Sequence, residues 1–280
     1  MPNSRLRLAS LLTLILLVVC CGFPIRDGLA ELQYTGVNLA GADFGEGNLP
    51  GTYNVHYTYP TTAEIDYFID KGVNTFRLPF RWERLQRSLN APLDTTELGR
   101  MQAFITHATD HGAHVVLDPH NYARYHGNVI GGSSVSNADF ADFWTRLAHE
   151  YKDNDRVIMG LMNEPNSMPT EQWASAANAA IAAIRQTGAE NLILVPGNAW
   201  TGAHSWTQNW YGTPNATAML TITDPGNNFA FDAHQYLDSD SSGTSSAIVS
   251  VEGDVVPRVG DGQHRGRVGS PIPVLRPTVR

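Results

Sequence analysis

The sequence of 280 residues has little cysteine, modest charge and no aromatic side chain after residue 246. Its two cysteines, Cys20 and Cys21, lie near the N-terminus, so the rest of the chain has neither disulfides nor thiol chemistry. Charged residues make up 16% and hydrophobic residues 42%, which is typical of a folded globular protein. The net charge of −8 disfavours nucleic acid as a partner, because phosphate groups bind to basic faces.

The N-terminal segment 1–30 is predicted to be a secretory signal peptide. Arg5 and Arg7 give a positive start, an apolar run from Leu8 to Phe23 follows, and Ala30 suits a cleavage site. The run is short for a bilayer span of about 20 residues, so we favour a cleaved signal over a transmembrane anchor. We therefore expect a secreted protein, extracellular or periplasmic, with no membrane partner after cleavage.

Beyond this segment, short apolar runs alternate with amphipathic stretches at spacings that accommodate one strand, one helix and two loops. Thr61, Asp94 and Ser136 mark helix starts, each followed three residues later by Glu or Asp, and Thr170 is predicted to cap a fourth, Ala-rich helix. Such alternation predicts an α/β fold with a parallel sheet. The apolar runs are centred near Val37, Phe76, Val116, Ile158, Ile193 and Phe231.

Two folds satisfy this alternation, an open doubly wound sheet and a closed (β/α)8 TIM barrel. No Gly-rich phosphate loop follows the first apolar run, so a nucleotide-binding sheet loses support. Ionisable residues recur where apolar runs end, at Arg77, His120, Glu164 and His234. Because barrel active sites are built at the C-terminal ends of several strands, we predict a TIM barrel with a functional site at that end.

Each of these residues also has a purely structural interpretation. Arg77 suits a buried salt bridge, and a single His120 is more often structural than catalytic. Taken by itself, Glu164 is suited to a structural role in which it accepts hydrogen bonds from a loop. We expect Asp118 to stabilise its own loop through hydrogen bonds. Four strands that end in this way are hard to explain structurally, so we favour a functional site.

The motifs at these strand ends resemble glycoside hydrolase family 5. Residues 74–85 (NTFRLPFRWERL) and 117–127 (LDPHNYARYHG) are similar to its cellulase-type endoglucanases, and the resemblance covers roughly residues 33–245. It implies a (β/α)8 barrel that hydrolyses internal β-1,4 bonds of cellulose or related β-glucans with retention. A β-mannanase or exo-glucanase of the same family is the alternative. The motif residues are Arg77, His120, Asn163-Glu164-Pro165 and His234-x-Tyr236.

Retaining hydrolysis needs two carboxyl groups about 5 Å apart, one to protonate the leaving oxygen and one to attack the sugar. Glu164 suits the role of general acid/base. The neutral amide of Asn163 is suited to hydrogen bonding with a sugar 2-hydroxyl. The resemblance implies roles for four further residues: Arg77 orients the nucleophile, His120 and His234 contact the sugar, and Tyr236 steadies the nucleophile.

Aromatic residues after the fifth apolar run are candidate sugar platforms, because the apolar faces of sugars pack on flat rings. Trp200 lies nearest the strand end and is expected to bind substrate. For Trp206 and Trp210, sugar binding and ordinary loop packing are equally good interpretations. Tyr122 and His126 are weaker candidates for sugar binding. The expected partner is a β-glucan polysaccharide bound by a monomer.

No cofactor and no metal ion are expected from the sequence. His107, His111 and His114 cluster around the end of the second predicted helix, away from the expected site. The helix dipole favours positive side chains at that position, which accounts for these histidines without a metal.

The C-terminal part departs from the barrel pattern. Residues 237–280 are too few for two further βα units, and 247–280 are rich in Val, Arg, Gly and Pro. We therefore expect an incomplete barrel over 31–246, with about six βα units and without strands seven and eight, and a non-native or disordered tail over 247–280. Our hypothesis is a truncated or frameshifted gene, which reading the coding DNA in all three frames would test.

This departure matters for activity. Glu252 is the one glutamate after Tyr236, and its position leaves little room for a crossover helix and a new strand before it. The nucleophile is therefore predicted to be missing. Such a chain is expected to be inactive, or at most a weak glucan-binding fragment. It is also expected to aggregate, because the edges of its first and sixth strands are left unpaired.

Overall fold

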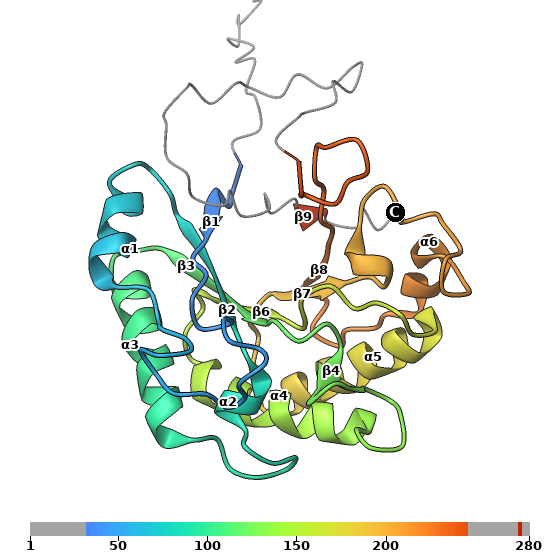
Figure 1. Ribbon diagram of the computed structural model, residues 1–280, viewed down its shortest axis with the longest axis horizontal. Coiled ribbons are helices and arrows are strands. Elements are labelled where there is room, and N and C mark those ends of the chain that lie inside the picture. Colours follow the sequence, from blue (N-terminus) through green and yellow to red (C-terminus); the bar gives the residue numbers. More distant parts are fainter. Residues whose placement is uncertain (1–31, 246–273, 276–280) are drawn as a thin grey trace, which may run out of the picture. The chain divides into compact units, whose positions relative to one another are not determined.

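The computed structural model describes residues 32–245 and 274–275 (Figure 1). The predicted signal peptide, Glu252 and most of the predicted tail lie outside these ranges. The described residues from Tyr34 onward form one structural unit. Within the described ranges, no helix combines the length and apolar character needed to span a bilayer.

Six parallel strands form the centre of the fold, and their order in the sheet follows their order in the chain. Each coincides with one of the predicted apolar runs, which confirms the incomplete (β/α)8 barrel. The strands are β1 (Gly36–Asn38), β2 (Thr75–Phe80), β3 (His114–Pro119), β6 (Val157–Gly160), β7 (Ile193–Pro196) and β8 (Phe229–Asp232).

The sheet is open over the part of the chain that the structure describes. Strand β1 pairs with β2 alone, whereas β8 is followed by a two-residue strand, β9 (Val274–Leu275), which pairs antiparallel with Phe231 and Asp232. The prediction of a bare outer edge on the sixth strand is therefore wrong at these two positions. A closed barrel continues with a parallel strand instead, so β9 does not stand in for strand seven.

Four long helices lie in an arc around the strands (Figure 1). Thr61 and Ser136 form capping boxes at the starts of two of them, and Asp94 accepts a hydrogen bond from the Glu97 amide at the start of a third, as predicted. These helices are α1 (Thr62–Ile69), α3 (Thr95–Asp110), α4 (Asn137–Tyr151) and α5 (Thr170–Gln186).

The predicted cap of α5 is wrong by one residue. Pro169 is the N-cap and makes no side-chain hydrogen bond to the helix, and Thr170 is already helical. The Thr170 hydroxyl is engaged elsewhere, because it accepts a hydrogen bond from Asn198 Nδ2 at 3.3 Å. The shorter elements are α2 (Trp82–Leu85), β4 (Arg124–Tyr125), β5 (Asn128–Val129), η1 (Ala199–Thr201), α6 (Asn215–Ala218) and η2 (Met219–Thr221).

Alternation along the strands separates an outer packing face from an inner one. Outward side chains such as Phe76 and Leu117 pack with the helices in the main core. Inward side chains form a smaller apolar cluster that includes Val116 of β3 and Ala230 of β8. Two residues further along, both strands place an aspartate on this same inner face. The inner face therefore changes from apolar to ionisable toward the C-terminal ends of the strands.

The loop after β1 is held by a buried arginine of α2. Arg84 has no exposed surface and donates hydrogen bonds to the backbone oxygens of Ala42, Phe44 and Pro50. Its guanidinium also lies 3.8 Å from the centre of the Tyr57 ring. A buried cation is tolerated only when its donors are satisfied, so these contacts fix the path of the loop.

Candidate active site

Glu164 and His234, which follow different strands, are in direct contact at the C-terminal ends of the strands. Glu164 Oε1 lies 2.7 Å from His234 Nδ1, and Asp232 Oδ2 lies 3.5 Å from His234 Nε2. Burial alone lowers the pKa of His234, but the carboxylates of Asp232 and Glu164 outweigh it and raise this pKa to about 9. The imidazole is therefore a buried cation between two acidic side chains at neutral pH.

The backbone at Glu164 is left-handed, with φ at 43°. This region is uncommon for residues other than glycine, and such strain clusters where function requires one side-chain direction. Neighbouring contacts hold the segment: Asn163 N donates to Pro119 O at 2.9 Å, and Asn166 Nδ2 donates to Glu164 O at 3.0 Å. The Glu164 side chain is fixed in place but keeps 14% of its surface exposed.

A second set of polar contacts joins β1, β2, β3 and the end of β6. The Arg77 guanidinium donates to Asn38 Oδ1 at 2.8 Å and to Asn163 Oδ1 at 2.5 Å, and it pairs with Asp118 Oδ2 at 2.8 Å. His120 Nδ1 donates to Asp118 Oδ2 at 2.8 Å, so its other nitrogen, Nε2, accepts from Asn163 Nδ2 at 3.2 Å. We refer to Asn38, Arg77, Asp118, His120 and Asn163 as the arginine network.

Asp118 is the buried charge at the centre of the arginine network. Burial raises the pKa of this carboxyl, but Arg77 and His120 outweigh burial and hold the pKa below its usual range. Asp118 ties down its own loop through His120, as expected, but it also pairs with Arg77 of another strand. The buried salt bridge considered for Arg77 is thus present, and it lies within the predicted site.

Trp200 is the predicted sugar platform, and it keeps 41% of its surface exposed. It belongs to η1, where its φ is 57°, and its backbone N–H donates to Pro165 O at 3.0 Å, next to Glu164. Its ring centre lies 6.0 Å from that of Tyr211. An open pocket of about 380 Å³ continues from there, lined by Ser167, Met168, Pro169 and Tyr211.

The two other tryptophans of this region differ in their surroundings. Trp206 is half-buried and packs against the main core, with its ring centre 5.8 Å from that of Phe231. Trp210 is half-exposed. Loop packing therefore accounts for Trp206, whereas Trp210 presents a ring to solvent.

The remaining candidates lie in loops around the site. The Tyr122 hydroxyl lies 3.3 Å from His120 Nε2, beside the arginine network. The backbone of His126 donates to the buried carboxylate of Glu83 at 2.7 Å, which is a structural contact. The Tyr236 ring packs over Gly243, where an added Cβ would lie 2.4 Å from the ring.

Two polar residues of the site, Asn38 and Asp232, were not among the predicted site residues. Each is the last residue of its strand and, by alternation, faces inward. The rule that selected Arg77 and His120, a polar residue where an apolar run ends, applies equally to both. For the strand that ends in Asp232, the prediction went to His234, two residues further along.

Comparisons with known proteins agree with this geometry. Residues 35–264 match the model of Cellulase (glycosyl hydrolase family 5). Endo-beta-1,4-glucanase B of Aspergillus niger is 40% identical over 235 residues, which are 84% of this chain and 68% of that protein.

Solved structures give the same result. The structure of XacCel5A in complex with cellopentaose has a TM-score of 0.76 at 53% identity, covering 78% of this chain and 69% of that chain. The endoglucanase Cel5A of Pseudomonas stutzeri, in complex with cellobiose, has a TM-score of 0.69 at 37% identity, covering 75% of this chain and 61% of that chain. With the strand order, the strand-end residues and the family match in agreement, this chain is a member of glycosyl hydrolase family 5.

Proposed function

We propose that this chain is the catalytic domain of a retaining endo-β-1,4-glucanase that acts on cellulose or related β-glucans, with Glu164 as its general acid/base. The contact between Glu164 and His234 at the strand ends, beside the arginine network, carries the proposal. Relatives named as endo-beta-1,4-glucanases and a neighbour in complex with cellopentaose support the substrate class.

In the proposed reaction Glu164 protonates the leaving glycosidic oxygen while a second carboxylate, the nucleophile, bonds to the anomeric carbon; Glu164 later takes a proton from the water that hydrolyses this glycosyl-enzyme ester. The second carboxylate is not among the site residues described above. His234 donates to Oε1 and fixes the direction of the carboxyl group. The Asn163 amide is held by Arg77 and His120, so its orientation toward a sugar hydroxyl is set before substrate binds.

Substrate is proposed to lie along the exposed ring of Trp200. The pocket beside Tyr211 adds to this surface, which suits a chain of several sugar units. His120 and Tyr236 are proposed to border the subsite at which the bond is cleaved.

A second candidate function follows from the carboxylates of this site. Asp118 pairs with Arg77 and His120. Asp232 and Glu164 lie on opposite sides of the imidazole ring of His234. Neither carboxylate forms the adjacent pair with Glu164 that retention requires, and Glu252 lies outside the described residues. This favours a non-catalytic domain that binds glucan weakly.

Reducing-sugar release from carboxymethylcellulose and from mannan tests both functions. Release from the cellulose derivative, lowered about 10²–10⁴-fold in Glu164→Gln and unchanged in the exposed control Glu190→Gln, supports the glucanase. Release from mannan alone overturns the substrate class. Binding of cello-oligosaccharide without release supports the second candidate, and loss of release in Glu252→Gln would identify the missing nucleophile.

We also propose that the protein is exported and that its mature form begins near Glu31. The apolar run after Arg7 and the small residue Ala30 support this. Expression in a bacterial host, followed by mass measurement of the protein in the periplasm and medium, tests the cleavage site. A protein that keeps its first 30 residues would contradict it.

A further inference from the structure

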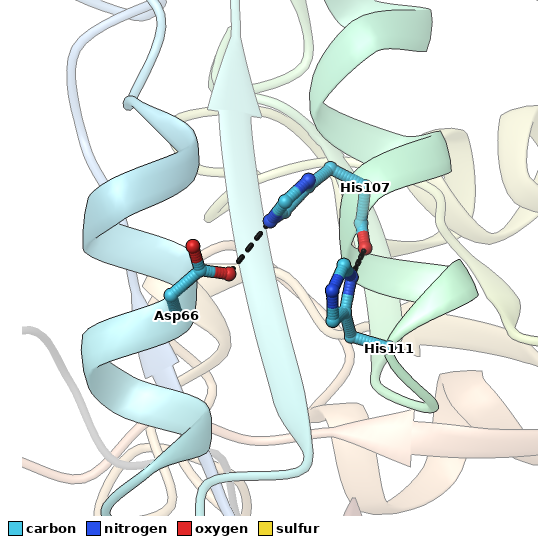
Figure 2. A group of neighbouring side chains, drawn as sticks. All are labelled: Asp66, His107 and His111. Carbon is cyan, nitrogen blue, oxygen red and sulfur yellow. Dashed lines mark hydrogen bonds and ion pairs between the residues drawn. The ribbon is translucent and has the colours of Figure 1, made fainter.

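A second cluster of ionisable side chains lies outside the active site, between helices α1 and α3. Asp66 comes from α1, and His107 and His111 come from the last turn and the C-cap of α3. One ligand atom from each lies within 4.8 Å of the others. The two histidines are four residues apart and therefore share one face of the helix. Figure 2 shows both imidazoles on the side of α3 that faces α1.

The hydrogen bonds of the cluster orient its rings. His107 Nε2 lies 2.7 Å from Asp66 Oδ1, and His111 Nδ1 lies 2.7 Å from the carbonyl oxygen of His107. A carbonyl only accepts, so Nδ1 of His111 carries a proton, and Nε2 is the ring nitrogen left to coordinate an ion. Metal-binding histidines are commonly fixed in this way, with the second ring nitrogen donating to a backbone carbonyl.

The position of the cluster separates it from the glucan site. His111 caps α3 just before β3 begins at His114, so the cluster lies at the N-terminal ends of the strands, opposite Glu164. Asp66 and His111 are exposed and His107 is half-buried, so an ion can reach all three from solvent. The C-terminal dipole of α3 adds a favourable field for a cation.

We propose that Asp66, His107 and His111 bind a divalent transition-metal ion of the zinc type, which clips α1 to α3. Two imidazoles and one carboxylate are a common zinc donor set, with water in the fourth position. Tetrahedral coordination places donor atoms roughly 3.3 Å apart. His107 Nε2 and Asp66 Oδ1, now 2.7 Å apart, must therefore open by roughly 0.6 Å, and the widest pair, up to 4.8 Å apart, must close by roughly 1.5 Å; surface rotamers allow both shifts.

This proposal revises the sequence-based expectation of no metal. The sequence shows the histidines, but only the fold brings Asp66 of another helix to them. His114, the third histidine of that sequence cluster, lies on β3 with its ring nearly perpendicular to that of Tyr34, and it is not part of the proposed site.

Titration of the full chain with zinc, read with a competing chromophoric indicator, tests the site. We expect His107→Ala and His111→Ala each to weaken zinc binding by at least about 10-fold. Mutating a residue that only hydrogen-bonds to a zinc ligand already lowers metal affinity by about that factor. Asp66→Asn should weaken it in the same direction. The matched control is His149→Ala, an exposed histidine in the last turn of α4, which should keep the parent affinity.

Thermal unfolding gives a second readout, because an ion that binds only the folded chain raises the unfolding midpoint. Zinc should raise the midpoint of the parent chain, of His149→Ala and of Glu164→Gln, but not of the His107 or His111 variants. If an alanine variant loses helix content, the Asn variant at that position replaces it. Equal affinities and equal midpoint shifts in all variants, or no binding to the parent chain, would overturn the proposal.

Discussion

At the scale of single residues, His234 links the proposed acid/base to the stability of the fold. Its pKa is about 9 in the folded chain, above its ordinary value of about 6.5. A raised histidine pKa contributes stability that is fully present below the ordinary value and is lost as the pH rises through the folded value. The stabilising charge of His234 should therefore disappear between about pH 6.5 and 9.

We expect His234→Gln to remove this pH dependence. The parent chain should lose on the order of 3 kcal/mol of unfolding free energy through that window from this group, and the variant should not. Urea unfolding at about pH 6 and pH 9 measures the difference. His149→Gln, an exposed histidine of α4, is the control and should behave like the parent chain. Equal pH dependence in the parent and His234→Gln would contradict the prediction.

Arg77 should be important for folding as well as for the proposed site. Arg77→Ala leaves the buried carboxylate of Asp118 with His120 as its remaining partner, and removing one partner of a buried ion pair costs about 3–5 kcal/mol. Arg87→Ala is the matched control, because its ion pair with Asp94 is partly exposed and is worth less than about 1 kcal/mol.

Urea unfolding of both variants measures these losses. Adding Asp118→Asn to Arg77→Ala should recover part of the loss, since the uncompensated charge is removed. A loss in Arg77→Ala no larger than in Arg87→Ala would show that the arginine network contributes little to stability.

The sequence predicted most of the active site at this scale for a simple reason. Reactive residues follow apolar runs, and parallel strands bring their C-terminal ends together. What each residue contacts was not predictable: Asp118 was expected to bind its own loop, yet it also pairs with Arg77. That contact depends on the register of β2 against β3, which no local pattern specifies.

At the scale of elements, the sequence predicted the starts of helices most accurately, from their capping residues. The capping boxes at Thr61 and Ser136 were predictable, because each involves residues only three apart. The start of α5 was not, since Thr170 bonds to Asn198, which is distant in sequence. The hairpin of β4 and β5 was also missed, because two-residue strands leave no periodic pattern.

The cap of α4 offers a test at this scale. Ser136→Ala should lower the unfolding free energy by about 1 kcal/mol, because the amide of Asp139 loses its side-chain acceptor. Ser133→Ala, in the exposed loop before the helix, should change stability by less than about 0.5 kcal/mol. Urea unfolding of both variants makes the comparison, and equal small effects would mean that the cap does not stabilise the folded chain.

At the scale of the whole molecule, the open sheet is the feature with the clearest consequence. Over the described residues, the outer edge of β1 has no strand beside it. Edge strands with unpaired backbone groups pair readily with other chains.

We therefore expect the 280-residue chain to associate as its concentration rises. Size-exclusion chromatography with light scattering should show the mean mass increasing across a dilution series, and moderate salt should change this little, because backbone pairing rather than surface charge drives it. A constant monomer mass at every concentration would contradict the prediction and would indicate that the edge of β1 is protected.

The buried Arg84 has a consequence for ligand binding. Its guanidinium donates hydrogen bonds to three carbonyl groups of the loop after β1. The loop therefore loses its conformational freedom on folding, before any ligand binds. A ligand that touches the loop then meets a surface that needs no ordering, and the entropic penalty of association is correspondingly small. The ligand-free and ligand-bound forms of this loop should superimpose.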